Sequence, residues 1–183
     1  KITKEEHSAF VGTTDYHMWS TLKNRFHIEE PLEEIIDMKR RRFIENIHLV
    51  CLVDNFEQFV NILYGEGYRM GLASSNNRKI VDIVMDRFKL DKYLEVSISG
   101  EDVSQGKPHP EIFLKAAKRM NVEPSSCLVI EDAEKGVIAA KAAGMKCIGL
   151  KSPYAIGQDL SQADLIVSNF NELYLDKIKG LFD

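Results

Sequence analysis

Hydrophobic and polar positions follow two different patterns along this chain, with a change near residue 52. In residues 1–52 the apolar side chains recur at helical spacing, and no segment is typical of a strand. The pattern predicts helices over about residues 3–10, 16–26 and 31–47. We therefore expect a helical segment over residues 1–52 and a different architecture after it.

Short apolar runs alternate with helical patterns from residue 53 onward. The clearest unit extends from Cys127 to Leu150, where an apolar run, an alanine-rich helix and a second apolar run follow one another. Strands that alternate with helices form a parallel sheet covered on both faces, so the sequence predicts an α/β core. Beyond that unit we expect strands at residues 68–73, 94–99 and 164–168, and helices at 56–63, 80–88, 110–121 and 171–181.

Composition narrows the class of protein. The 183 residues are 44% hydrophobic and 28% charged, and no apolar run approaches the length that spans a membrane. The formal net charge of -4 weighs against nucleic acid as a partner. Three widely spaced cysteines suggest no disulfide framework. We expect a cytoplasmic monomer that binds neither nucleic acid nor membranes.

Polar side chains follow three of the predicted strand regions. Ser74 comes directly after Leu72 and Ala73, Lys107 lies in a loop, and Glu131 and Asp132 follow an apolar run. Parallel sheets bind ligands at the carboxyl ends of their strands, where these groups would meet. A hydroxyl, a cation and paired acids suit an anion held together with Mg²⁺, and phosphate is the obvious anion.

Each of these groups also has a purely structural explanation. Residues 74–77 could cap the next helix, Glu131 and Asp132 could open the helix that follows them, and Lys107 before Pro108 could lie in an exposed turn. The residues alone leave both interpretations open.

Lys39 lies within the apolar stripe of the helix predicted over residues 31–47. A lysine in such a stripe must extend to solvent or meet an anion. Our hypothesis is that Lys39 faces a substrate cleft, whereas the neighbouring Arg40, Arg41 and Arg42 form a solvated surface.

Three segments resemble motifs II, III and IV of the haloacid-dehalogenase-like (HAD) hydrolases: Ala73–Asn76, Gly106–Phe113 and Val129–Gly136. They look closest to the subgroup that contains β-phosphoglucomutase and small sugar-phosphate phosphatases. The resemblance implies an α/β fold, with a Rossmann-like parallel sheet core over residues 53–183 and part of a helical cap domain over residues 1–52.

The resemblance also implies roles for individual residues. Ser74 would bind the transferring phosphoryl oxygen, with Ser75 and Asn76 helping to bind the substrate. Lys107 would stabilise charge on that group, and the bond before Pro108 would be cis. Asp132 would bind Mg²⁺ directly, and Glu131 would be a further ligand or would orient bound water.

One element of the family pattern is missing. The family reaction uses an Asp-x-Asp after a strand that precedes the cap, and this sequence contains no Asp-x-Asp. That strand lies in the middle of the family's sheet, so its absence would leave two facing edges without partners. We expect a truncated chain without phosphatase turnover; residues 48–53 are a candidate to fill the gap, although they look more like a hinge.

The resemblance implies that the parent enzyme transfers a phosphoryl group from a small phosphorylated metabolite, such as a sugar phosphate, to water through an aspartyl-phosphate with Mg²⁺. A first alternative is a phosphohexomutase, although Asp15 stands where the mutase would have a sugar-phosphate-binding arginine. A second alternative is a non-catalytic fragment or binding module that keeps only the anion pocket.

Overall fold

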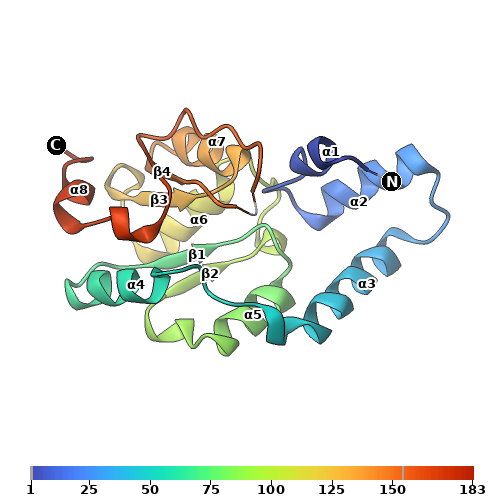
Figure 1. Cartoon of the computed structure of the whole chain (residues 1–183), viewed down its shortest axis with the longest axis horizontal. Coiled ribbons are helices and arrows are strands. Elements are labelled where there is room, and N and C mark those ends of the chain that lie inside the picture. Colours follow the sequence, from blue (N-terminus) through green and yellow to red (C-terminus); the bar gives the residue numbers. More distant parts are fainter. Residues whose placement is uncertain (1, 154) are drawn as a thin grey trace.

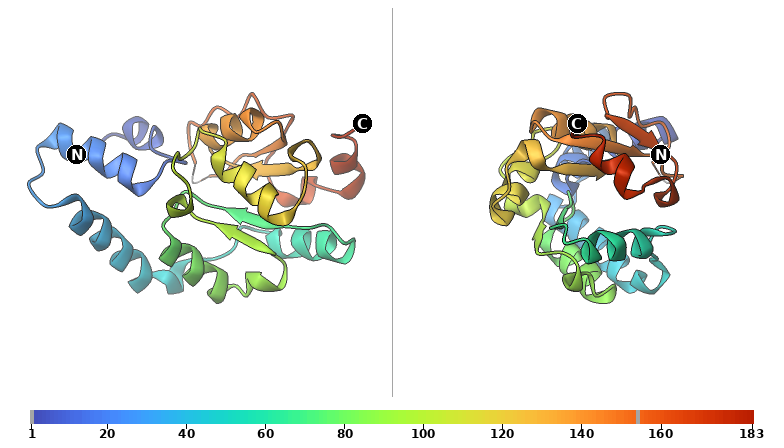
Figure 2. Two further views of the ribbon diagram at one scale, coloured as in Figure 1. Left: turned by 180° about the vertical axis from the view of Figure 1, so that it is seen from behind. Right: turned by 90° about the vertical axis from the view of Figure 1, so that its left-hand side faces the viewer.

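The N-terminal helices project from one end of the molecule. The computed structural model describes residues 2–153 and 155–183. Helices α1 (Lys4–Ser8), α2 (Asp15–Phe26) and α3 (Leu32–Glu45) form this projection, and α2 packs against α3 (Figure 1). The short 3₁₀ turn η1 (Ile47–Leu49) leads back to the rest of the chain (Figure 2).

Local sequence explains where these helices begin and end. The Thr14 hydroxyl accepts a hydrogen bond of 3.3 Å from the His17 amide and so caps α2. Pro31 immediately precedes α3, as expected for a residue that favours a first helical turn. At the other end Asn46 donates from Nδ2 to the Arg42 carbonyl at 2.8 Å, and α3 ends two residues earlier than the pattern predicted.

Strands alternate with helices after residue 53, as the sequence predicted. Strands β1 (Gly71–Ala73) and β2 (Val96–Ile98) form one parallel sheet, and β3 (Leu128–Glu131), β4 (Lys146–Leu150) and β5 (Leu165–Val167) form another. The helices of this region are α4 (Phe56–Gly65), α5 (Arg78–Arg87), α6 (Glu111–Met120), α7 (Glu134–Ala142) and α8 (Leu175–Lys179). The connections include 3₁₀ turns η2 (Leu90–Lys92), η3 (Gly100–Asp102), η4 (Pro124–Ser126) and η5 (Phe170–Glu172).

Apolar side chains pack on both faces of the strands. One cluster joins α6 and α7 to β3 and β4, and the other joins α4, η5 and α8 to β4 and β5. Helix α6 contacts both β1 and β2 and also packs against α7, so it connects the two sheets. The α/β fold class with parallel sheets is therefore confirmed.

The predicted closing helix is wrong in its first half. The turn η5 occupies residues 170–172, with the Asn169 side chain accepting a hydrogen bond of 3.0 Å from the Asn171 amide. Tyr174 has an extended backbone, and α8 starts only after it. An Asx-type turn competes here with the helix that the apolar spacing favours.

The core is divided into two sheets rather than one. Strands β1 and β3 both lie in the interior, yet each pairs only with the strand on its far side, β2 or β4. Residues 48–53, the candidate to fill this gap, contain the end of η1 and a segment without strand pairing. Residues 48–53 therefore do not fill the gap as a strand, and their interpretation as a hinge remains a prediction. Within the described residues no helix is long and apolar enough to cross a membrane.

Candidate functional site

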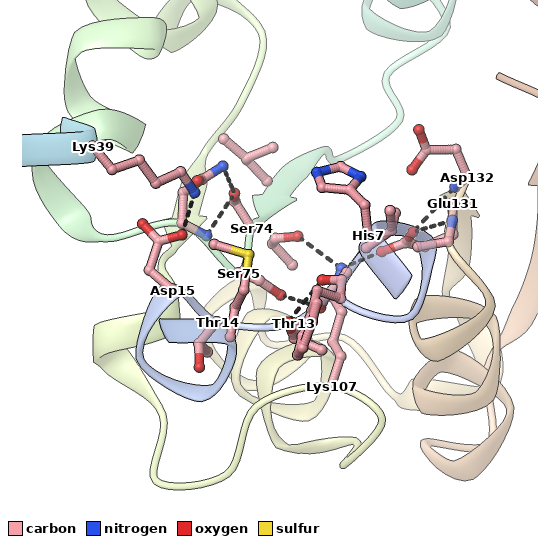
Figure 3. A pocket seen from close by; sticks show the side chains of 18 residues that line it. His7, Thr13, Thr14, Asp15, Lys39, Ser74, Ser75, Lys107, Glu131 and Asp132 are labelled. Carbon is pink, nitrogen blue, oxygen red and sulfur yellow. Dashed lines mark hydrogen bonds and ion pairs between the residues drawn. The ribbon is translucent and has the colours of Figure 1, made fainter. Parts of the chain in front are cut away.

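A pocket of about 400 Å³ lies where β1 and β3 end, and the chain that connects α1 to α2 lines one side of it (Figure 3). All seven residues that the sequence singled out line it: Lys39, Ser74, Ser75, Asn76, Lys107, Glu131 and Asp132. The structure thus brings together groups separated by more than ninety positions along the chain. Sequence reasoning missed several other lining residues, among them His7, Thr13 and Met18.

The segment after β1 presents the Ser74 hydroxyl to the pocket. Ser74 remains attached to the sheet because its amide donates to the Ile98 carbonyl at 2.9 Å. Its hydroxyl accepts hydrogen bonds from the Asn76 amide at 3.2 Å and from Asn76 Nδ2 at 3.3 Å. The N-cap of α5 is instead Asn77, whose Oδ1 accepts from the Ile80 amide at 3.0 Å. Helix capping therefore does not account for Ser74.

Ser75 connects the pocket to the N-terminal segment. Its hydroxyl donates to the Gly12 carbonyl at 2.7 Å. Gly12 has a φ of +79°, and a Cβ there would lie 2.9 Å from the Ala133 Cβ. Glycine therefore allows the turn at residues 11–14 to approach the strand ends closely.

Lys107 is a buried cation rather than an exposed turn residue. Its ammonium forms an ion pair with Glu131 and donates to the Ala73 carbonyl at 3.3 Å. The ammonium also lies 4.7 Å from the centroid of the Phe113 ring. The peptide bond between Lys107 and Pro108 is cis, as the family resemblance implied.

Glu131 is held by donors on both carboxylate oxygens. Oε1 pairs with Lys107, and Oε2 accepts from the amides of Asp132 at 3.1 Å and Ala133 at 3.2 Å. These bonds satisfy backbone donors just before α7, so Glu131 also has the structural role that the sequence left open. Both carboxylate oxygens of Glu131 are therefore already engaged within the protein.

Asp132 is the acid of the pocket whose pKa is raised. Burial raises the pKa of its carboxyl, the charge of Glu131 raises it further, and hydrogen bonds and Lys107 counteract this only in part. No group of three or more histidine, cysteine or acidic residues suited to a metal ion occurs in the part of the chain that the structure describes. Mg²⁺, however, commonly uses one or two carboxylates together with water and substrate phosphate, so Asp132 and Glu131 fit this ion.

The helix α3 brings Lys39 to the far side of the pocket. Its ammonium forms an ion pair with Asp15, at the start of α2 (Figure 3). Lys39 therefore meets an anion, one of the two alternatives expected for a lysine in an apolar stripe, while its side chain remains 39% exposed. The other carboxylate oxygen of Asp15, Oδ2, is buried and has no hydrogen-bond partner in the described structure.

Comparison with known proteins shows which family this chain belongs to. The family model described as haloacid dehalogenase-like hydrolase matches residues 1–150. A phosphoglycolate phosphatase of Escherichia coli is 36% identical over 150 residues, which cover 78% of this chain and 60% of the relative. A chloroplastic 5-amino-6-(5-phospho-D-ribitylamino)uracil phosphatase of Arabidopsis thaliana is 32% identical over 132 residues, which cover 72% of this chain and 35% of the relative. The aligned part thus spans between about a third and three fifths of these relatives.

Solved structures share the fold. The β-phosphoglucomutase of Clostridium difficile superposes with a TM-score of 0.86 at 22% identity, over 100% of this chain and 82% of that one. CbbY of Rhodobacter sphaeroides, solved in complex with phosphate, gives a TM-score of 0.84 at 22% identity, over 93% of this chain and 80% of that one.

Proposed function

The chain belongs to the haloacid dehalogenase-like hydrolase family, and from this premise we propose that its pocket serves the transfer of a phosphoryl group from a small phosphorylated metabolite to water. The observation that carries the proposal is the convergence of Ser74, Lys107 and Asp132 on one pocket. A hydroxyl, a buried ammonium and a half-buried acid are groups suited to holding a magnesium phosphate. The names of the two phosphatase relatives are consistent with this chemistry.

Each group has a defined part in phosphate binding. The Ser74 hydroxyl donates to a phosphoryl oxygen, and the adjacent Ser75 amide and Asn76 side chain complete that side of the pocket. Lys107 has three N–H donors, two of which already meet Glu131 and Ala73, so the third can reach the phosphoryl group. Asp132 would hold Mg²⁺, with Glu131 orienting its water; when bound, the ion would neutralise charge on the phosphoryl oxygens.

We further propose that the 183 residues bind phosphate without turning it over. The family reaction begins with attack by an aspartate of an Asp-x-Asp, and none occurs in this sequence. Of the three carboxylates that line the pocket in the described structure, Asp15 is paired with Lys39, Glu131 is engaged through both oxygens, and Asp132 is assigned to the metal ion, so none is proposed as the nucleophile.

The far side of the pocket favours a hydroxylated metabolite. Lys39 and Asp15 together contribute no net charge, so a second strongly anionic group gains little there. The buried Asp15 Oδ2 needs a donor, and a sugar hydroxyl supplies one. We therefore propose a sugar phosphate as the substrate class.

Phosphate binding by the chain tests the proposal. Isothermal titration with inorganic phosphate in the presence of Mg²⁺ should show binding, and Ser74→Ala should weaken it roughly tenfold through loss of a charged hydrogen bond. Ser125→Ala, at an exposed position in η4, is the matched control and should leave the affinity unchanged. Equal affinity of the Ser74 variant and the control would refute phosphate binding at this pocket. Mg²⁺-dependent phosphate release by the verified 183-residue chain would refute the proposed lack of turnover.

A further inference from the structure

Side chains of the core hold the turn between α1 and α2, residues 9–14. In the first turn of α7, the Lys135 ammonium donates to the Ala9 carbonyl at 2.7 Å. Gln158, in the connection between β4 and β5, donates to Ser8 at the end of α1. All but the first of the turn residues line the pocket at the strand ends, whereas neither anchor lines it in the described structure. The two anchors therefore act on one wall of the pocket from behind.

The Gln158 carboxamide joins three segments of the chain. Its Oε1 accepts from the amide of Glu134, the first residue of α7, at 3.1 Å. Its Nε2 donates to the Ser8 carbonyl at 3.1 Å and to the Ser8 hydroxyl at 2.8 Å. The orientation of the carboxamide is unambiguous, because the Glu134 amide can only donate and the Ser8 carbonyl can only accept. One planar group thus fixes the end of α1 relative to the start of α7.

Helix capping explains only part of this arrangement. The Glu134 amide is one of the first amides of α7, which find no acceptor within the helix, and Ala133 before it makes no side-chain cap. Oε1 of Gln158 supplies that acceptor, but the bonds from Nε2 to Ser8 add nothing to α7. The close approach to Ser8 depends on Gly157, which has a φ of +79° and where a Cβ would lie 3.3 Å from the Ser8 Oγ. The contact therefore serves the turn as well as the helix.

The anchored turn leads directly into Asp15, on the side of the pocket away from Asp132. Thr14, the last turn residue, caps α2, and α2 begins at Asp15. Figure 3 shows Thr14 and Asp15 across the pocket from Asp132. The buried Oδ2 of Asp15 has no hydrogen-bond partner in the described structure. A displaced turn would therefore move this acceptor and would leave the strand ends, with their proposed phosphoryl-binding groups, in place.

We propose that Gln158 and Lys135 are positioning residues of the pocket. They fix residues 9–14, and thereby place Asp15 where it can accept a hydrogen bond from the organic part of a phosphorylated metabolite. The identity of that ligand rests on the proposed function, whereas the positioning of the turn does not. Loss of either anchor should weaken binding of the metabolite and spare inorganic phosphate, which has no organic part.

One substitution at each anchor tests the proposal. Gln158→Glu keeps an acceptor for the Glu134 amide but loses the donors to Ser8, so it separates positioning from capping. Lys135→Met removes the bond to Ala9 and leaves the capped amide untouched.

Two controls carry the same changes at exposed positions. They are Gln162→Glu, in the same connection as Gln158, and Lys118→Met, on α6. Amide hydrogen exchange of the ligand-free chain is followed by NMR. Isothermal titration with inorganic phosphate and with ribose 5-phosphate, both in the presence of Mg²⁺, gives the two affinities.

Both anchor variants should loosen the turn. Exchange should become roughly fivefold faster at Val11 and Thr13, whose amides each close the turn with a hydrogen bond of 3.1 Å, and should stay unchanged at Glu134. Ribose 5-phosphate should bind roughly fivefold more weakly, with inorganic phosphate within about twofold of the parent chain. The controls should match the parent chain in both measurements.

The outcomes that would overturn the proposal are distinct. Unchanged exchange in the turn would exclude a positioning role, and faster exchange at Glu134 in Gln158→Glu would assign the effect to lost capping. Equal losses for the two ligands, or no loss for ribose 5-phosphate, would exclude a role in recognising the organic part. A control that behaves like its anchor variant would assign the effect to charge alone. If the parent chain binds neither ligand, the proposed function fails, and the exchange data alone decide whether the two residues position the turn.

Discussion

Lys107 and Glu131 form an ion pair whose side chains are only 5% and 10% exposed. The pair joins the loop before α6 to the end of β3, and the Lys107 ammonium also reaches the Ala73 carbonyl at the end of β1. It therefore links the two separate sheets at the edge of the pocket. Buried charges of this kind require their partners, because an isolated charge cannot be solvated.

Replacing one member of this pair should be strongly destabilising. Lys107→Met leaves the Glu131 carboxylate buried without its cation, and we expect a loss of about 3–5 kcal/mol in the free energy of unfolding. The double variant with Glu131→Gln removes the stranded charge, so it should recover part of that loss. Urea denaturation of Lys107→Met, of Glu131→Gln and of the double variant measures the coupling free energy between the two side chains.

A second ion pair provides the control. Lys141 and Asp164 lie 2.6 Å apart with side chains 33% and 23% exposed, so Lys141→Met should cost no more than about 1 kcal/mol. Similar losses for the Lys107 and Lys141 variants would contradict the argument from burial. A double variant no more stable than Lys107→Met would contradict the argument from the stranded carboxylate.

Gly136 should not tolerate alanine, although it lies within α7. An alanine in place of a glycine in a helix is ordinarily stabilising by up to about 1 kcal/mol. A Cβ at Gly136, however, would lie 2.1 Å from the Glu131 carboxyl carbon. We expect Gly136→Ala to displace Glu131 and to destabilise the protein by about 1–3 kcal/mol in urea denaturation.

The matched variant is Gly65→Ala, at the end of α4. A Cβ there meets no atom within 4 Å, so the usual helical preference should apply and the change should be neutral or slightly stabilising. If the two variants shift the urea midpoint in the same direction, close contact with Glu131 does not determine the effect at Gly136.

The stability of the loop before Lys107 should depend on Asp102 and therefore on pH. Burial acts to raise the pKa of Asp102, but hydrogen bonds from the Ser99 amide and hydroxyl and from Arg78 outweigh it and hold the pKa well below its usual range. A lowered pKa means that the stabilisation is present above the unfolded-state pKa, near 3.9, and is lost as pH falls below it. Asp102→Asn should therefore cost about 2 kcal/mol near neutral pH, with a smaller difference from the parent protein below about pH 3.

Asp82 offers the comparison, because it contacts the same arginine from an exposed position at 3.1 Å. Asp82→Asn should change stability little at any pH. Urea denaturation at several pH values distinguishes the two variants, and a pH-independent effect of Asp102→Asn would show that its charge is not responsible.

The sequence allowed most of the core to be predicted, because the helices and strands there follow from local apolar spacing. It also allowed prediction of part of the pocket, since Ser74 and Asp132 follow strand ends and Lys107 lies in a segment that resembles a family motif, whereas His7, Thr13 and Met18 were missed. The ion-pair partners of these residues within the protein could not be predicted in this way. That Glu131 pairs with Lys107, or Lys39 with Asp15, depends on how distant elements pack rather than on local spacing.

Strand pairing was the other feature that the local pattern of apolar residues could not predict. The apolar character of residues 48–53 is compatible with a strand, but pairing requires their backbone to reach the free edges of β1 and β3. In the structure Val50, Cys51, Leu52 and Val53 line an apolar cavity without joining either sheet. A hydrophobic run thus specifies burial more firmly than it specifies a hydrogen-bonding partner.

Lys39 should contribute to the binding of a phosphorylated metabolite but not to the binding of inorganic phosphate. It lies across the pocket from the strand ends, so we expect Lys39→Ala to weaken binding of ribose 5-phosphate roughly tenfold and to leave inorganic phosphate within about twofold. The variant also leaves Asp15 without its cation, which adds an unfavourable charge near the organic part of the ligand. Isothermal titration with both ligands in the presence of Mg²⁺ gives the two affinities. The exposed Arg41, on the same helix, provides the control through Arg41→Ala, which should change neither. Equal losses for both ligands would place Lys39 at the phosphoryl group instead, and no loss for either would remove it from the binding site.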